Sequence, residues 1–202
     1  MTVLSFIQSK GGVGKSTLLC SLAYTLHADP NNKVVIMDTD KQGTSSKFAD
    51  KVGIPFLTEH DSPKIRPTLK ELKEQGYTHI FVDTAGFESD LIVFVVMSSD
   101  CVIVPTSPSE PDAQGLFKTL EHVQASIVND TAVVSVMNNA NSTMNISKSV
   151  TKALKNNNAP LLDCTIGSYS GFKELHSTGT LKGNAQRDIN RLIGALQIEN
   201  IL

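Results

Sequence analysis

The chain has 202 residues, 40% of them hydrophobic and 19% charged, which allows a sizeable core and excludes global disorder. Its net charge of −2 excludes a generally basic nucleic-acid coat, although a local basic patch stays open. Three cysteines, Cys20, Cys101 and Cys164, lie in apolar stretches without CxxC spacing. This usage favours buried reduced thiols over a metal or disulfide role.

Short β-rich runs alternate with helical patterns along the chain. In chain order we expect strand Val3–Gln8, helix Lys15–Ala28, strand Lys33–Met37, helix Thr68–Gln75, strand Thr78–Val82, helix 89–98, strand Asp100–Val104, helix Asp112–Val128, strand Thr131–Met137, helix Ile146–Asn156, strand Leu161–Ile166 and helix Asn184–Leu196. The strand runs are continuously apolar, which is typical of parallel strands buried on both faces. The pattern predicts an α/β fold, a mostly parallel twisted sheet flanked by helices on both faces.

Three further stretches bear on organisation. Gly53–Pro67 holds three prolines and is expected to be an irregular surface connection. The N-terminal apolar run is too short for a signal peptide, and no apolar run reaches the length of about 18 residues that a transmembrane helix needs. The apolar tail DINRLIGALQIENIL fits either a helix that closes the core or a membrane anchor. Because an amphipathic anchor needs several basic residues and the tail has only Arg191, we expect a closing helix.

The segment Lys10-Gly-Gly-Val-Gly-Lys-Ser-Thr17 lies between the first predicted strand and the first helix, as a phosphate-binding loop requires. Its glycines permit positive φ, so consecutive N–H groups can surround phosphates at the positive end of the helix dipole. Lys15 can reach the β- and γ-phosphates, and the Ser16 hydroxyl can coordinate Mg²⁺. The sequence thus predicts a site for nucleotide phosphates and Mg²⁺ at Gly11, Gly12, Val13, Gly14, Lys15, Ser16 and Thr17.

This loop departs from the standard G-x-x-x-x-G-K-[ST] pattern. Ser9 stands at the first glycine position, and a second lysine, Lys10, lies inside the loop. KGGVGKST resembles the deviant Walker A box of the ParA/MinD family of ATPases. The resemblance implies a P-loop NTPase fold of the deviant Walker A type, in which Lys10 reaches the phosphates held by the other subunit of an ATP-dependent homodimer. A positive group supplied in this way stabilises the charge that develops during hydrolysis.

Val34–Gly43 resembles the second family box, an apolar strand that ends in D-x-D-P-Q-G, with Lys41 in place of the proline. Two carboxylates at the end of a strand beside a phosphate loop can serve Mg²⁺ and an attacking water. The resemblance implies that Asp40 positions the water and that Asp38 lies nearer the metal shell. The implied catalytic residues are Lys10, Lys15 and Asp40.

Ile80–Gly86 resembles the Walker B strand of the family. The resemblance implies that Asp83 holds the Mg²⁺ shell through water, together with Ser16 and Asp38, and that Gly86 lets a switch loop approach the γ-phosphate. Val102–Asp112 resembles the next family strand with its Pro-rich turn. In Val136–Asn139, Asn138 is a candidate to hydrogen-bond the adenine edge, with an ordinary turn asparagine as the alternative.

The C-terminal part differs in charge. Residues 1–139 carry a net charge of −5 and residues 140–202 carry +3, which fits either a basic face or an ordinary solvated surface. Ile166–Gly179 resembles a late family segment in which Tyr169 stands where the family has a DNA-binding arginine. Four basic residues nearby in sequence are the candidate nonspecific DNA contacts: Lys173, Lys182, Arg187 and Arg191.

The leading hypothesis is a slow, Mg²⁺-dependent ATPase of the short ParA type, one domain spanning 1–202 without an N-terminal helix-turn-helix extension. It would dimerise on ATP, bind DNA nonspecifically and partition a plasmid or chromosome with a centromere-binding ParB-type adaptor protein. The expected location is cytoplasmic and nucleoid-associated, without a membrane partner. The alternatives are a MinD-like membrane switch, a positioner of protein cargo such as carboxysomes, and a metabolic or electron-transfer enzyme on the same scaffold.

Overall fold

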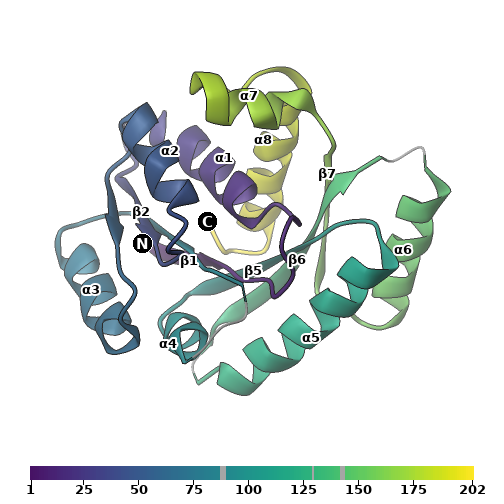
Figure 1. The fold of residues 1–202 in the computed structure, drawn as a ribbon, viewed down its shortest axis with the longest axis horizontal. Helices are drawn as coiled ribbons and strands as arrows, with labels where there is room; N and C mark the ends of the chain where they lie inside the picture. Colours follow the sequence, from purple (N-terminus) through teal and green to yellow (C-terminus); the bar gives the residue numbers. More distant parts are fainter. Residues whose placement is uncertain (87–89, 129, 142–143) are drawn as a thin grey trace.

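A parallel β-sheet forms the centre of the protein. The structure is a computed structural model that describes residues 1–86, 90–128, 130–141 and 144–202. Within these ranges seven strands form one sheet in the order β3-β2-β4-β1-β5-β6-β7 (Figure 1), and every pair is parallel. The strands are β1 (Thr2–Phe6), β2 (Val34–Asp38), β3 (Phe56–Thr58), β4 (His79–Asp83), β5 (Cys101–Thr106), β6 (Ala132–Ala140) and β7 (Leu161–Gly167).

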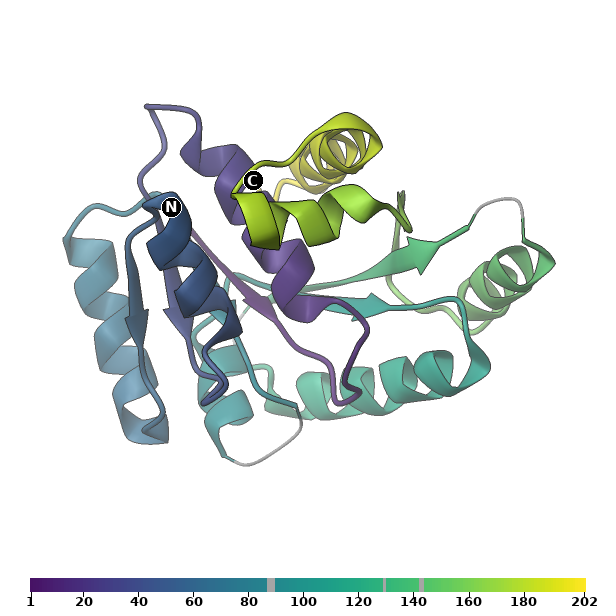
Figure 2. The same ribbon diagram turned by 45° about the horizontal axis from the view of Figure 1, so that its top comes forward.

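Helices cover both faces of the sheet (Figures 1 and 2). One face carries α1 (Lys15–His27), α2 (Thr44–Val52), α7 (Ser170–Thr178) and α8 (Gly183–Ile198). The other face carries α3 (Ser62–Glu74), α4 (Leu91–Met97), α5 (Glu110–Ser126) and α6 (Asn145–Asn156). Successive residues of β1 point to opposite faces, so Leu4 and Phe6 belong to the first core and Val3 and Ile7 to the second. The predicted fold class is confirmed.

The expectation for Gly53–Pro67 was wrong. This stretch contains β3 and the first six residues of α3. Pro63 lies in the first turn of α3, where a missing N–H removes no helical bond, and Pro67 lies on the exposed side. Buried Ile65, Leu69 and Leu72 recur at helical spacing and hold the helix against the sheet despite both prolines.

Two short helices, α2 and α7, were also not predicted. Both have nine residues, and each buries one or two large apolar side chains: Phe48 in α2, and Phe172 and Leu175 in α7. The predicted helix 89–98 begins at Ser89, which lies outside the described residues; α4 covers its remainder from Leu91.

The C-terminal segment packs as a closing helix. α8 buries Ala185, Ile189, Leu192 and Leu196 in the first core, as expected from its apolar pattern. Cys20, Cys101 and Cys164 are buried free thiols in the same core, also as predicted. Among the described residues, no helix is both long and apolar enough to cross a membrane.

Candidate functional site

The predicted site residues converge at the carboxyl ends of the central strands. Asp38 at the end of β2 and Asp83 at the end of β4 are register partners, and Phe6 at the end of β1 is the next partner of Asp83. Parallel strands all end at the same edge of a sheet, so the three segments that follow them lie together. Two side-chain hydrogen bonds connect neighbouring strand ends at this edge. The Thr39 hydroxyl donates to the Asp83 carbonyl (2.8 Å), and the Thr84 hydroxyl donates to the Phe6 carbonyl (2.8 Å).

The loop after β1 has the conformation of a phosphate-binding loop. Gly12 and Gly14 have φ values of 81° and 92°, in the left-handed region that favours glycine. Gly14 is the N-cap of α1 and its carbonyl accepts from the Leu18 N–H (2.9 Å). Among the residues that the structure describes, no side chain forms a capping hydrogen bond at this helix start. The first N–H groups of α1 are therefore available to a phosphate, at the positive end of the helix dipole.

Asn138 fixes this loop from β6. Its side-chain Nδ2 donates to the Val13 carbonyl at 2.7 Å, and the residue is 7% exposed. A Cβ on Gly14 would lie 2.2 Å from that Nδ2, so glycine is required there for space as well as for φ. From the sequence, Asn138 was a candidate to hydrogen-bond the adenine edge. In this structure its side-chain amide donates to the backbone of the phosphate-binding loop instead.

Lys15 lies at the start of α1 and is half-buried. Burial lowers the pKa of its ammonium, while the carboxylates of Asp83 and Asp40 oppose that fall. An ammonium held near two acids at a helix N-terminus is a suitable partner for the β- and γ-phosphates of a nucleotide.

Asp83 is a fully buried carboxylate at the carboxyl end of β4. It has no exposed surface, and neither oxygen has a partner within the described part of the chain. Burial raises the pKa of Asp83 to about 6, and Asp38 adds to the rise, while the Ser16 and Ser45 hydroxyls and Lys15 oppose it. Mg²⁺ keeps several waters and binds through one or two protein oxygens plus phosphates. The unpartnered carboxylate of Asp83, beside the Ser16 hydroxyl, fits that requirement.

Asp38 and Asp40 hold the loop after β2. Asp38 is fully buried and accepts from the Asp40 N–H (3.0 Å) and the Ser46 N–H (2.8 Å). Asp40 accepts from the Gln42 N–H through Oδ1 (2.9 Å), and its carbonyl accepts from the Gly43 N–H (2.9 Å). Asp38 thus shapes the turn that presents Asp40, a connection that its family role did not predict.

Lys10 points toward α5. Its Nζ lies 2.6 Å from Asp112 Oδ1, and the two side chains are 40% and 15% exposed. A buried cluster nearby also joins the loop to α5: the Thr119 hydroxyl donates to Gln8 Oε1 (2.7 Å), and Gln8 Nε2 donates to the Pro105 carbonyl (3.0 Å). None of these partners of the loop was predicted.

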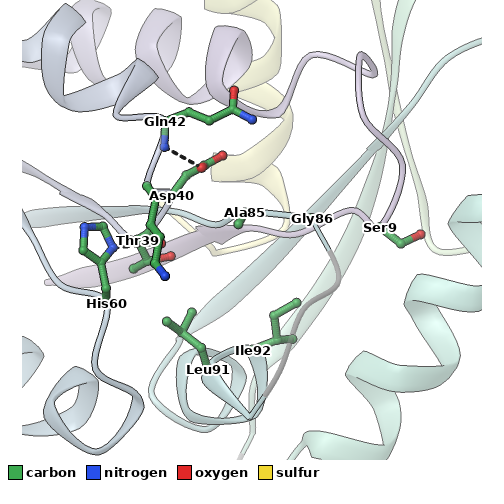
Figure 3. Close-up of a pocket in the computed structure, with 10 residues that line it drawn as sticks. Ser9, Thr39, Asp40, Gln42, His60, Ala85, Gly86, Leu91 and Ile92 are labelled. Atoms are coloured by element: carbon green, nitrogen blue, oxygen red, sulfur yellow. Dashed lines mark hydrogen bonds between the residues drawn. The ribbon is translucent and has the colours of Figure 1, made fainter.

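A cavity of about 640 Å³ opens beside Asp40 (Figure 3). Its lining includes Ser9, Thr39, Asp40, His60, Gly86 and Ile92. His60 Nδ1 lies 3.2 Å from the Thr39 carbonyl oxygen. The five histidines of the chain show no metal-ligand spacing, which predicts a surface or packing role for His60. Its place in the cavity could not be predicted, because it follows β3, a strand that the sequence pattern did not reveal. The switch loop expected after Gly86 enters residues 87–89, which lie outside the described residues.

The four residues nominated for DNA are exposed on or beside α7 and α8: Lys173, Lys182, Arg187 and Arg191. Arg191 lies 3.6 Å from Asp188, which offsets part of its charge. Tyr169, at the N-cap of α7, stacks with Phe172 at a ring-centroid distance of 6.4 Å. The aromatic ring in place of the family arginine therefore packs against the helix that it precedes.

Comparison with known proteins places these features in a family. The chain is 32% identical over 122 residues to the maintenance of carboxysome distribution protein A of Gloeobacter kilaueensis, covering 58% of this chain and 55% of that protein. It spans about half the length of the curated relatives that it matches.

Two solved structures resemble the fold along nearly the whole chain, each at 16% identity. A candidate plasmid partition protein of Borrelia burgdorferi B31 bound to AMPPNP has a TM-score of 0.76 and covers 98% of this chain and 99% of its own. The septum site-determining protein MinD of Pyrococcus horikoshii, complexed with Mg-ADP, has a TM-score of 0.76 and covers 99% and 96%. The profile of the CobQ/CobB/MinD/ParA nucleotide binding domain matches residues 4–181, and the chain belongs to this family.

Proposed function

We propose that this chain is an ATPase that dimerises on ATP and acts as a positional switch. The observation that carries the proposal is Lys10, a second lysine in a P-loop that already has Lys15. Its side chain is paired with Asp112 of α5 in this structure. Reaching the other subunit's phosphates would add positive charge to both sites only in the dimer.

In this proposal the remaining site residues have separate tasks. Gly11 to Thr17 surround the phosphates, with Lys15 at the β- and γ-phosphates. Ser16 and Asp83 hold Mg²⁺ and its waters, and Asp38 lies beside Asp83 at the metal shell. When bound, Mg²⁺ would neutralise charge on the phosphate oxygens. Asp40, which faces the cavity, orients the attacking water.

Lys10→Ala tests the proposal. It should leave ADP binding intact and abolish both the ATP-dependent dimer and hydrolysis, because its target lies in the other subunit. Light scattering after size exclusion, with ATP and with ADP, measures the dimer. Lys118→Ala, which removes an exposed lysine of α5, is the matched control and should behave as wild type. An ATP-dependent dimer of normal stability in Lys10→Ala would contradict the proposal.

The finer function that we propose is partition of a plasmid or chromosome. ATP-bound dimers would bind DNA nonspecifically in the cytoplasm, on the nucleoid, and a centromere-binding ParB-type adaptor would stimulate hydrolysis. The support is the exposed basic residues of α7 and α8, Lys173, Lys182, Arg187 and Arg191, which a dimer would double.

DNA binding is tested by fluorescence anisotropy on random-sequence duplex with ATP, ADP and no nucleotide. Phosphate contacts release counterions, so affinity should fall with a log–log salt slope of about −0.9 per phosphate neutralised. Reversing the charge of Lys173 should weaken binding to all sequences alike. Equal binding with and without ATP would contradict the switch.

A second candidate function is positioning of a protein assembly. The specific support is the similarity to the carboxysome distribution protein, together with Tyr169 in place of the family arginine. Deleting the gene separates the two functions. Loss of plasmid or chromosome inheritance favours partition, whereas misplaced protein assemblies with normal inheritance favour cargo positioning.

A further inference from the structure

A second hollow, of about 490 Å³, lies between α6 and the strands β6 and β7. Its lining includes Ala140 of β6, Thr165 of β7 and Ser147 of α6. Three exposed lysines of α6, Lys148, Lys152 and Lys155, also line it. It shares no lining residue with the cavity beside Asp40, so it is separate from the proposed catalytic site.

Irregular strand pairing explains why this space exists. The register between β6 and β7 shifts twice, between Ser135 and Met137 and between Met137 and Ala140. β7 is also the last strand in the order of the sheet, as far as the described part of the chain shows. The irregular pairing distorts the surface of the sheet beneath α6, so the helix does not pack closely on β6 and β7 along its whole length.

The charge on this surface has one sign. α6 contains three lysines and no acidic residue, and their spacing of four and then three residues places them on one side of the helix. Asp163 of β7 lies 3.6 Å from Lys155 and offsets one of the three charges. α3 has basic residues at the same spacing, but it also contains Glu71 and Glu74, so its four basic residues leave a net charge of +2 against +3 for α6, and Lys70 lies 3.8 Å from Glu74. The lysine row of α6 therefore has the larger excess of positive charge.

A buried polar group points to a ligand in the hollow. Ser147 is 5% exposed, lines the hollow, and its hydroxyl has no hydrogen-bond partner within the described ranges. Buried hydroxyls in proteins are nearly always hydrogen-bonded. A ligand of this hollow would need a group that hydrogen-bonds the Ser147 hydroxyl and an apolar group that fills the space near Ala140 and Thr165. It would also need negative charge to pair with Lys148 and Lys152.

We propose that the hollow is a docking site for an acidic peptide segment of another protein. The segment would insert an apolar side chain beside Ser147 and set carboxylates against Lys148 and Lys152. Duplex DNA supplies the charge but has no side chain to fill a hollow. α6 lies on the face of the sheet opposite to α7 and α8 (Figures 1 and 2), so the site is also separate from the proposed DNA surface. The proposal does not depend on the nucleotide cycle.

The test uses a fluorescein-labelled 14-residue peptide with two leucines four residues apart, flanked by glutamates. Wild-type protein should bind it, and the variant Lys148→Ala/Lys152→Ala/Lys155→Ala should bind about tenfold more weakly, as expected for the loss of the two exposed ion pairs that Lys148 and Lys152 make with the peptide. The matched control, Arg66→Ala/Lys70→Ala/Lys73→Ala on α3, removes the same charge at the same spacing and should bind as wild type. All six side chains lie at the surface or half-buried, so both variants should fold.

Two further arms separate insertion from charge attraction. Thr165→Glu places an acid in the hollow without altering a buried residue and should weaken binding. A peptide with serines in place of the leucines should also bind more weakly. The proposal would be overturned if the wild type did not bind the peptide, or if the α3 control lost as much affinity as the α6 variant. It would also be overturned if duplex DNA displaced the peptide and itself bound the α6 variant more weakly by the same factor.

Discussion

Asp112→Ala should strengthen the ATP-dependent dimer. If Lys10 must leave Asp112 to reach the other subunit, the pair observed here opposes dimerisation, and removing Asp112 removes that opposition. Lys10 Nζ and Asp112 Oδ1 are 2.6 Å apart, and the lysine side chain is 40% exposed. A pair this exposed stabilises by about 0.2–1 kcal/mol. A dimer breaks two such pairs, so its dissociation constant should fall about 2- to 30-fold, by the relation of about 1.4 kcal/mol per tenfold change.

The assay is sedimentation equilibrium with a non-hydrolysable ATP analogue. Asp112 also lies in the first turn of α5, where a carboxylate stabilises the helix dipole by about 0.3–1 kcal/mol. Glu110→Ala is the control, because Glu110 is an exposed acid in the same turn. Both variants should melt slightly earlier than wild type, but only Asp112→Ala should dimerise more tightly. A dissociation constant in Asp112→Ala that matches Glu110→Ala, or exceeds that of wild type, would refute the reasoning.

Three further outcomes are expected at the nucleotide site. Lys15→Ala should abolish ATP binding in calorimetry, because the ammonium directed at the phosphates is lost; near-normal affinity would be inconsistent with the assigned loop. Asp40→Ala should bind ATP and dimerise but hydrolyse at least about 100-fold more slowly, since it removes a group that acts on the attacking water; an unchanged kcat would transfer that role to another group. Gly14→Ala should destabilise by about 2–3 kcal/mol in urea unfolding, from positive φ and displacement of Asn138, and Asn138→Ala in the same chain should restore part of the loss.

The parts of the site that the sequence predicted are contiguous in the chain. Each of these parts lies within a short segment whose pattern indicates its structure: the loop with its positive-φ glycines and Lys15, the end of β2 with Asp38, and the end of β4 with Asp83. Parallel strand ends then bring these segments to one edge of the sheet, because each loop follows its own strand. This is why the fold class and the phosphate loop could be predicted without a structure.

The partners of the loop could not be predicted, because they are distant in sequence. Gln8 and Thr119 are 111 residues apart, and they meet only because β5 lies next to β1 and α5 follows β5. Asn138 reaches Val13 from a strand two places along the sheet from β1. The short elements were missed in the sequence for a different reason. Pairing with β2 holds β3 in the sheet, and burial of Phe48 holds α2 on it, and the patterns of both elements are too brief to reveal these tertiary contacts.

The three buried thiols make the protein its own reporter of unfolding. Cys20, Cys101 and Cys164 belong to one core although they come from α1, β5 and β7. Burial raises the pKa of each thiol, which depletes the reactive thiolate as well as hiding it from reagents and oxidants. Alkylation of these thiols in the native protein therefore requires that the core opens first. The rate at which three thiols per chain become reactive measures that opening directly, without a label and with nucleotide, DNA or peptide present.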